Sequence, residues 1–155
     1  MSELKQKLRS DMTAAMKARD ALTLGTLRMA LAAITNEEVS GSTARELSDV
    51  EVEAVLAKEV KKRKESAEAF EGAGRTELAE KERAESAVIA AYLPEQLSDD
   101  EITALVASAV SEVAESTGAA PTMRQMGLVI KAAQAKAAGR AEGAKVAAAV
   151  KAALA

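Results

Sequence analysis

Only two prolines, Pro94 and Pro121, interrupt a chain of 155 residues that is otherwise rich in the strongest helix formers. Ala, Leu, Lys, Glu and Arg lose little conformational freedom in a helix, whereas the β-branched and aromatic residues that favour strands are sparse. Phe70 and Tyr92 are the only aromatic residues. The composition therefore predicts an all-α fold whose core is built from Leu, Val, Ile, Met and Ala.

The first part of the chain, residues 1–94, is predicted to be a four-helix module with a long charged helical hairpin. Apolar residues recur at helical spacing in each of its segments, as from Leu4 to Met16. Asp20 is placed to cap the second helix, and a capping box at Ser48–Glu51 opens the third. That helix continues into charged sequence and turns at Gly72–Gly74, and the fourth helix returns over about 77–93.

Pro94 ends the fourth helix, and a second module of three helices is predicted over residues 95–155. A second capping box, Ser98–Glu101, opens its first helix, which Gly118 ends. The next helix begins near Thr122, with Met123 among its inward residues, and closes at Gly139. The last helix is predicted over about 142–154.

Charge is distributed unevenly, although the net charge is only −3. Carboxylates dominate the helix predicted after Ser98. From Pro121 onward the cations are opposed by Glu142 alone; they are Arg124, Lys131, Lys136, Arg140, Lys145 and Lys151. Cations gathered in this way favour contact with the phosphates of a nucleic acid. The C-terminal module is therefore predicted to be a basic, RNA-binding module.

Within this module, Arg124, Lys131, Lys136, Arg140 and Lys145 are the candidate phosphate ligands. Arg140 is expected close to a helix N-terminus, where backbone N–H groups also favour an anion. Three glycines, Gly127, Gly139 and Gly143, are interpreted as positions of close approach by a backbone or ligand. Helix packing is the alternative explanation for these glycines.

A second basic patch is predicted at Lys61, Lys62, Arg63 and Lys64. Folding the hairpin at its glycines brings this run beside Glu80, Glu82 and Glu85. Ion pairs across the hairpin, each worth a few tenths of a kcal/mol, explain the run without any partner. A binding face is the other explanation, and the sequence leaves both open.

Several classes of function are disfavoured by residues that the sequence lacks. Without Cys or His the chain has no thiolate nucleophile and lacks the commonest metal ligand, so no cofactor and no metal are expected. Two separated aromatic rings do not form a stacking platform, so RNA contact is expected to be with backbone and shape. No segment reaches the roughly 20 apolar residues of a membrane span, and no signal region is apparent, so a cytoplasmic location without membrane contact is expected.

The blocks Met126–Lys131 and Gly139–Val146 resemble the tail domain of the B subunit of the tRNA-dependent amidotransferase that acts on Asp-tRNA(Asn) and Glu-tRNA(Gln). The same tail closes the YqeY family. Arg19–Asp20 with Thr26–Met29, Lys61–Ser66 and Tyr92–Leu97 resemble that family as well. The resemblance covers essentially the whole chain.

The resemblance implies a tail that holds tRNA while other domains and a separate amidase subunit perform the chemistry. On this basis the chain is interpreted as a non-catalytic, tRNA-associating accessory protein of translation. Two alternatives stay open: an adaptor whose hairpin docks an aminoacylation or amidotransferase protein, and a carbon–nitrogen ligase with glutamine as amido donor. Whether it is an enzyme at all stays undecided, although no Gly-rich phosphate loop is present.

Overall fold

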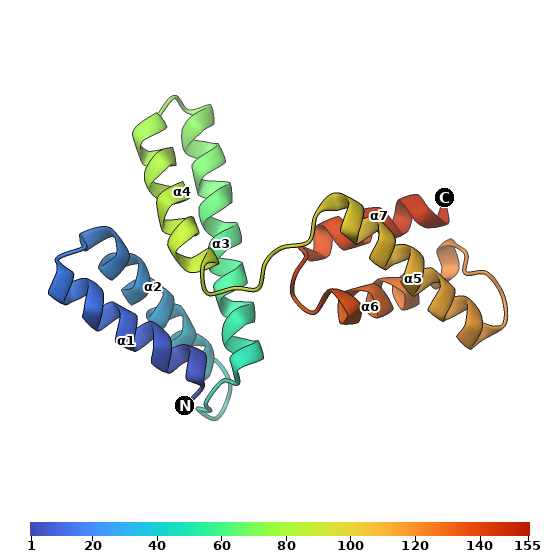
Figure 1. Cartoon of the computed structure of the whole chain (residues 1–155), viewed down its shortest axis with the longest axis horizontal. Helices are drawn as coiled ribbons and strands as arrows, with labels where there is room; N and C mark the ends of the chain where they lie inside the picture. The colour runs from blue at the N-terminus through green and yellow to red at the C-terminus, as the bar shows by residue number, and fades with distance from the viewer. The chain divides into compact units, whose positions relative to one another are not determined.

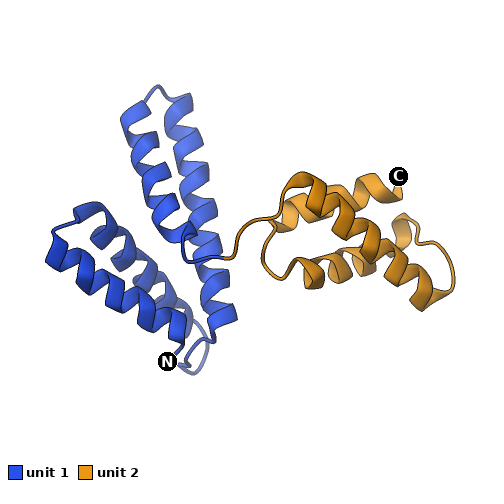
Figure 2. Cartoon of the chain, viewed as in Figure 1, with its two compact units in different colours: residues 1–93 blue, residues 94–155 orange.

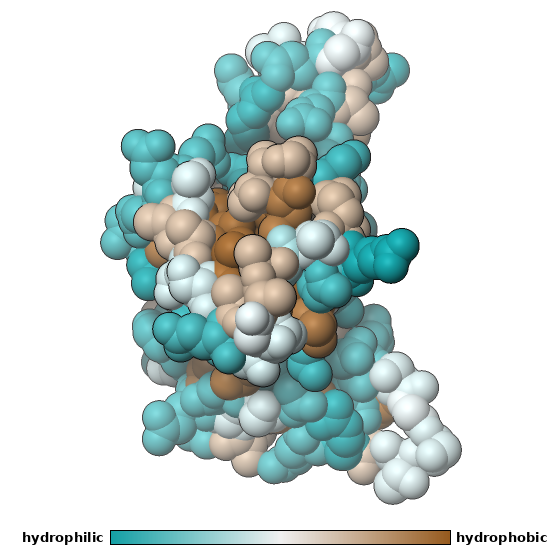
Figure 3. Space-filling model, turned by 90° about the vertical axis from the view of Figure 1, so that its right-hand side faces the viewer, coloured by the Kyte–Doolittle hydropathy of each residue, from teal (hydrophilic) through white to brown (hydrophobic).

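The computed structural model describes residues 1–155 and is all-α, as the composition predicts (Figure 1). The chain divides into two compact units, unit 1 (Met1–Leu93) and unit 2 (Pro94–Ala155), coloured separately in Figure 2. No helix is both long enough and apolar enough to cross a membrane. Hydrophilic residues cover most of the face shown in Figure 3, and a patch of exposed apolar residues lies among them.

Unit 1 consists of two helical hairpins. The first pairs α1 (Glu3–Ala18) with α2 (Ala21–Glu38), and the second pairs α3 (Asp49–Gly72) with α4 (Thr76–Ala90). The capping box that opens α3 is formed, with Ser48 accepting from the Glu51 amide and Glu51 accepting from the Ser48 amide. These local signals fix where the helices begin.

The core of unit 1 lies where the two hairpins meet. Its largest fully buried side chains are aliphatic: Leu8, Leu27, Ile34, Val52, Leu56 and Ile89. At its edge the Lys5 ammonium lies 2.6 Å from Glu38 Oε2, with both side chains largely buried, and ties the start of α1 to the end of α2. Beyond this core, α3 and α4 pair with each other and present their remaining faces to solvent (Figure 1).

Unit 2 packs three helices: α5 (Asp99–Thr117), α6 (Met126–Ala137) and α7 (Gly143–Leu154). A short 3-10 helix, η1 (Met123–Gln125), precedes α6. Small aliphatic residues fill the core, among them Val106, Ala109, Val129, Ala133, Val146 and Val150. The inward position predicted for Met123 is wrong: because it lies in the 3-10 turn rather than the α-helix, its side chain is 44% exposed.

A charged hydrogen bond ties the turn that follows α4 to α1. Tyr92 Oη donates to Asp11 Oδ2 at 2.6 Å, and the Lys7 ammonium lies 5.3 Å from the centre of the Tyr92 ring. The hydrogen bond from Tyr92, followed by that from Lys7, lowers the pKa of Asp11 below its ordinary value of 3.8. Asp11 is therefore most stabilising when it is ionised.

We expect Tyr92→Phe to destabilise unit 1 by about 1 kcal/mol at neutral pH, because a partly exposed, charged acceptor loses its donor. The lowered pKa of Asp11 means that the contribution is present above its ordinary pKa and is lost as pH falls through the lowered one. Urea denaturation of both proteins from pH 7 to 3 measures the difference. A gap that persists unchanged at pH 3 would assign the effect to packing of the ring instead.

Candidate nucleic-acid interface

All five candidate phosphate ligands of unit 2 are exposed. Arg124 lies in η1, Lys131 and Lys136 in α6, Arg140 in the loop after α6, and Lys145 in the first turn of α7. The structure therefore places the candidates on η1 and on the helical hairpin formed by α6 and α7. They do not all share one environment on it.

Lys136 and Lys145 are paired with carboxylates of α5. Lys136 Nζ lies 2.9 Å from Glu112 Oε2, and Lys145 Nζ lies 3.7 Å from Asp99 Oδ1. Exposed pairs of this kind are worth at most about 1 kcal/mol, so a phosphate can replace the carboxylate. Unit 2 has seven acidic residues, five of them on α5, against six cations, and therefore carries no net positive charge. The prediction that the C-terminal module is basic therefore holds only for its α6–α7 hairpin and not for the whole of unit 2.

Arg124 and Lys131 lie seven residues apart on the side of η1 and α6 that faces away from the buried residues Val129 and Ala133. The ion pairs of unit 2 are those of Lys136 and Lys145, so Arg124 and Lys131 belong to none. Leu128 lies between them along the helix and is 54% exposed. Leu128 is not among the residues predicted from the sequence, although its spacing of four from Arg124 and three from Lys131 indicates the shared face.

Arg140 is held in place by backbone contacts on both sides. Its Nε donates to the Glu95 carbonyl at 3.0 Å, and its own carbonyl accepts from the Leu97 amide at 2.8 Å. The side chain is thereby fixed by one edge, and its terminal nitrogens donate to no protein acceptor. The nearby start of α7 has no side-chain cap, because Glu142 does not accept from its first turn. This end of the hairpin therefore offers open N–H donors to an anion.

The three glycines have different roles, and none makes a close backbone approach within unit 2. Gly139 adopts φ +78°, a left-handed conformation that the turn after α6 requires. A Cβ at Gly127 would meet nothing within 4 Å, and one at Gly143 would make ordinary contact with Gln134 Nε2 at 3.6 Å. No backbone of the chain therefore comes close to Gly127 or Gly143, and for these two glycines the interpretation of close approach applies only to a ligand.

The glycines provide a matched pair of stability predictions. Gly127→Ala is expected to stabilise unit 2 by roughly 0.5–1 kcal/mol, because the helix gains propensity without a clash. Gly139→Ala is expected to destabilise it by about 1 kcal/mol, because an L residue is strained at positive φ. Chemical denaturation of the two variants measures both changes, and equal signs would contradict the assignment.

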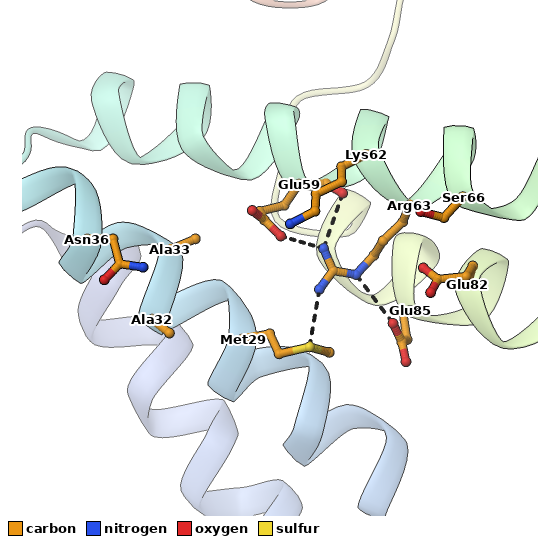
Figure 4. A pocket seen from close by; sticks show the side chains of 10 residues that line it. All are labelled: Met29, Ala32, Ala33, Asn36, Glu59, Lys62, Arg63, Ser66, Glu82 and Glu85. Atoms are coloured by element: carbon orange, nitrogen blue, oxygen red, sulfur yellow. Dashed lines mark hydrogen bonds and ion pairs between the residues drawn. The ribbon is translucent and has the colours of Figure 1, made fainter. Parts of the chain in front are cut away.

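The second basic patch is not a continuous surface, because Arg63 points inward while Lys61, Lys62 and Lys64 are exposed. The Arg63 side chain is 6% exposed and lines a groove of about 340 Å³ between α2, α3 and α4 (Figure 4). Its Nη1 donates to Glu59 Oε2 at 2.6 Å, its Nε lies 3.4 Å from Glu85 Oε2, and its Nη2 contacts Met29 Sδ at 3.8 Å. The prediction of Arg63 as a surface contact is wrong.

The ion pairs expected across the α3–α4 hairpin form in part, since Arg63 pairs with Glu85 as predicted. Arg63 with Glu85 and Arg83 with Glu71 form such pairs. Lys61, Lys62 and Lys64 form none, so neutralisation by α4 does not explain these lysines. These three lysines therefore interact with solvent or with a partner outside unit 1.

Comparison with known proteins identifies the family of the chain. The model of YqeY-like proteins matches residues 5–154. An uncharacterized protein of Schizosaccharomyces pombe is 34% identical over 96 residues, which span 62% of this chain and 76% of that protein. Altered inheritance of mitochondria protein 41, mitochondrial, of Clavispora lusitaniae is 35% identical over 113 residues, which span 71% of this chain and 64% of that protein. The chain belongs to the YqeY family.

Proposed function

We propose that this chain is a non-catalytic, tRNA-associating accessory protein that binds the RNA backbone through the α6–α7 hairpin of unit 2. The observation that carries the proposal is the exposed face of η1 and α6, where Arg124 and Lys131 have no carboxylate partner. Arg140, beyond the end of α6, adds a pre-positioned guanidinium. The likeness of this segment to the tail domain of the tRNA-dependent amidotransferase supports the choice of tRNA.

The uneven distribution of charge over unit 2 favours RNA binding on one side of the unit. Asp99 and Glu112 of α5 engage Lys145 and Lys136, while the outward face of α6 is free of carboxylates. Phosphates are repelled by α5 and attracted by the cations of α6 and the following loop. The proposal is therefore that RNA lies against α6 and the start of α7, away from the exposed face of α5.

The residues on this face favour backbone contact over reading of base sequence. Unit 2 contains no aromatic side chain, since Phe70 and Tyr92 both belong to unit 1, so bases have no ring on which to stack. Cations that contact phosphates fix position without reading sequence. Leu128 adds an apolar surface for a ribose or an exposed base edge.

The test is a titration of the full chain against unfractionated tRNA between 50 and 200 mM salt. Each phosphate contact contributes roughly 0.7–0.9 to the slope of log K against log salt, so three contacts give a slope of about −2 to −3. As a control, Glu112→Gln frees Lys136 and is expected to strengthen binding slightly. Affinity that does not change with salt, or an absence of binding at 50 mM, would remove the proposal.

A further inference from the structure

Three lysines share the solvent face of α3. Lys58, Lys61 and Lys62 are all exposed, and their spacing of three and four residues places them within one helical turn of each other. None of the three forms an ion pair with another part of unit 1. This set is called the α3 lysine face below.

The carboxylate best placed to neutralise Lys62 is engaged by Arg63. Glu59 lies three residues before Lys62, a spacing that supports an ion pair, but its Oε2 binds Arg63 Nη1 at 2.6 Å instead. Glu85 of α4 also faces Arg63, on another side of the guanidinium (Figure 4). Buried Arg63 thus engages both carboxylates, and Lys62, which lines the same groove, forms an ion pair with neither.

Glu65 does not replace these carboxylates. It is exposed four residues after Lys61 but pairs with no cation, and an acidic residue that follows its lysine is the less favourable order in a helix. Like charges one turn apart destabilise a helix. The α3 lysine face therefore adds nothing to the stability of unit 1, and its charge is available to an external anion.

We propose that the α3 lysine face is a second contact for the phosphates of the RNA that unit 2 binds. The inference rests on the proposed function for the identity of the RNA, but on different residues in a different unit. Apart from Glu65, the exposed residues of α3 within four positions of these lysines are small or themselves cationic, as Ala54, Ala57 and Lys64 are. Protein interfaces are depleted of lysine and gain their affinity from buried large side chains, which this face lacks. Phosphates require only the charges.

The two contacts have separate consequences for binding. Unit 2 alone gives a salt dependence set by Arg124, Lys131 and Arg140, and the α3 lysine face adds its own released counterions. Each set therefore contributes its own increment to the slope of log K against log salt. Neutralising one set leaves the increment of the other in place.

The experiment compares two triple variants of the full chain in tRNA titrations over 50–200 mM salt. The test variant carries Lys58→Gln, Lys61→Gln and Lys62→Gln. The control carries Arg9→Gln, Lys17→Gln and Arg28→Gln, which removes equal charge from exposed positions of unit 1 that form no ion pair. We expect the test variant to bind at least threefold more weakly than the control at 50 mM, with a slope shallower by about 1–2. Its denaturation midpoint is expected to equal or exceed that of the parent.

Equal affinity of the test and control variants overturns the inference and leaves the proposed function standing if neutralisation of the unit 2 cations still weakens binding. A parent chain that does not bind tRNA removes both. Labelled polyglutamate provides a further arm. If it binds the parent more tightly than tRNA does and loses that binding in the test variant, the face recognises an acidic protein instead, and the inference is wrong.

Discussion

Replacement of Arg63 by Met is expected to destabilise unit 1 by about 3 kcal/mol. The guanidinium is 6% exposed and lies between Glu59, 17% exposed, and Glu85, 9% exposed. Removing one partner of a buried ion pair leaves the other charge uncompensated in a medium that solvates it poorly. Methionine fills much of the same volume, so a cavity is not the main source of the loss.

Urea denaturation followed by tyrosine fluorescence measures this change in unit 1 selectively, because Tyr92 is the only tyrosine and the chain has no tryptophan. Lys64→Met is the matched control: the same change at the next residue, on an exposed side chain, is expected to alter stability by no more than about 0.5 kcal/mol. Adding Glu59→Gln and Glu85→Gln to Arg63→Met is expected to restore most of the loss. If Arg63→Met matches Lys64→Met, Arg63 is not the buried anchor described here.

Neutralising Arg124, Lys131 and Arg140 together by Gln is expected to weaken tRNA binding at least tenfold at 50 mM salt. The slope of log K against log salt is expected to become shallower by about 2–3, because three phosphate contacts no longer release counterions. The fold is expected to survive, because all three side chains are exposed. Titrations of parent and variant at several salt concentrations measure both quantities.

The control for this variant is Lys136→Gln with Lys145→Gln, which removes the two lysines that α5 carboxylates already engage. Each of these lysines must leave a carboxylate before it binds a phosphate, so the loss of affinity is expected to be smaller. A loss in the control that exceeds the loss in the triple variant would move the RNA to the α5 side of unit 2.

Local signals predict much of this fold. The capping box at Ser48 opens α3 as expected, and the glycine after α5 ends that helix in the left-handed conformation. At Ser98 only half of the predicted box forms, because Ser98 accepts from the Glu101 amide but Glu101 does not accept from the Ser98 amide. Such signals act between residues within one turn, so one sequence is enough to recognise them. The all-α class follows from composition for the same reason.

The inward orientation of Arg63 is also indicated by the sequence. The indication comes from its position in the helical repeat and not from its residue type. Arg63 follows the buried Val60 by three residues and precedes the buried Ala67 by four, which places it on the core side of α3. Its neighbours Lys62 and Lys64 have similar chemistry but are exposed. A run of four cations conceals this difference unless each is placed on the helix.

Other features of the candidate site depend on packing that a local pattern does not contain. The pairing of Lys136 with Glu112 and of Lys145 with Asp99 requires α5 to lie against α6 and α7 in one particular register. The hold on Arg140 depends on the Glu95 carbonyl, which the fold brings back from the start of unit 2. The sequence identifies the cations, but only the tertiary structure shows that Lys136 and Lys145 pair with carboxylates and that Arg124 and Lys131 do not.

A lysine acetylation footprint of the full chain, with and without saturating tRNA, locates the RNA most directly. We predict that Lys131 becomes protected when tRNA is bound, while Lys17, exposed on α1 of unit 1, reacts at an unchanged rate. An acetylation rate at Lys131 that is the same with and without bound tRNA would show that RNA does not lie on the outward face of α6.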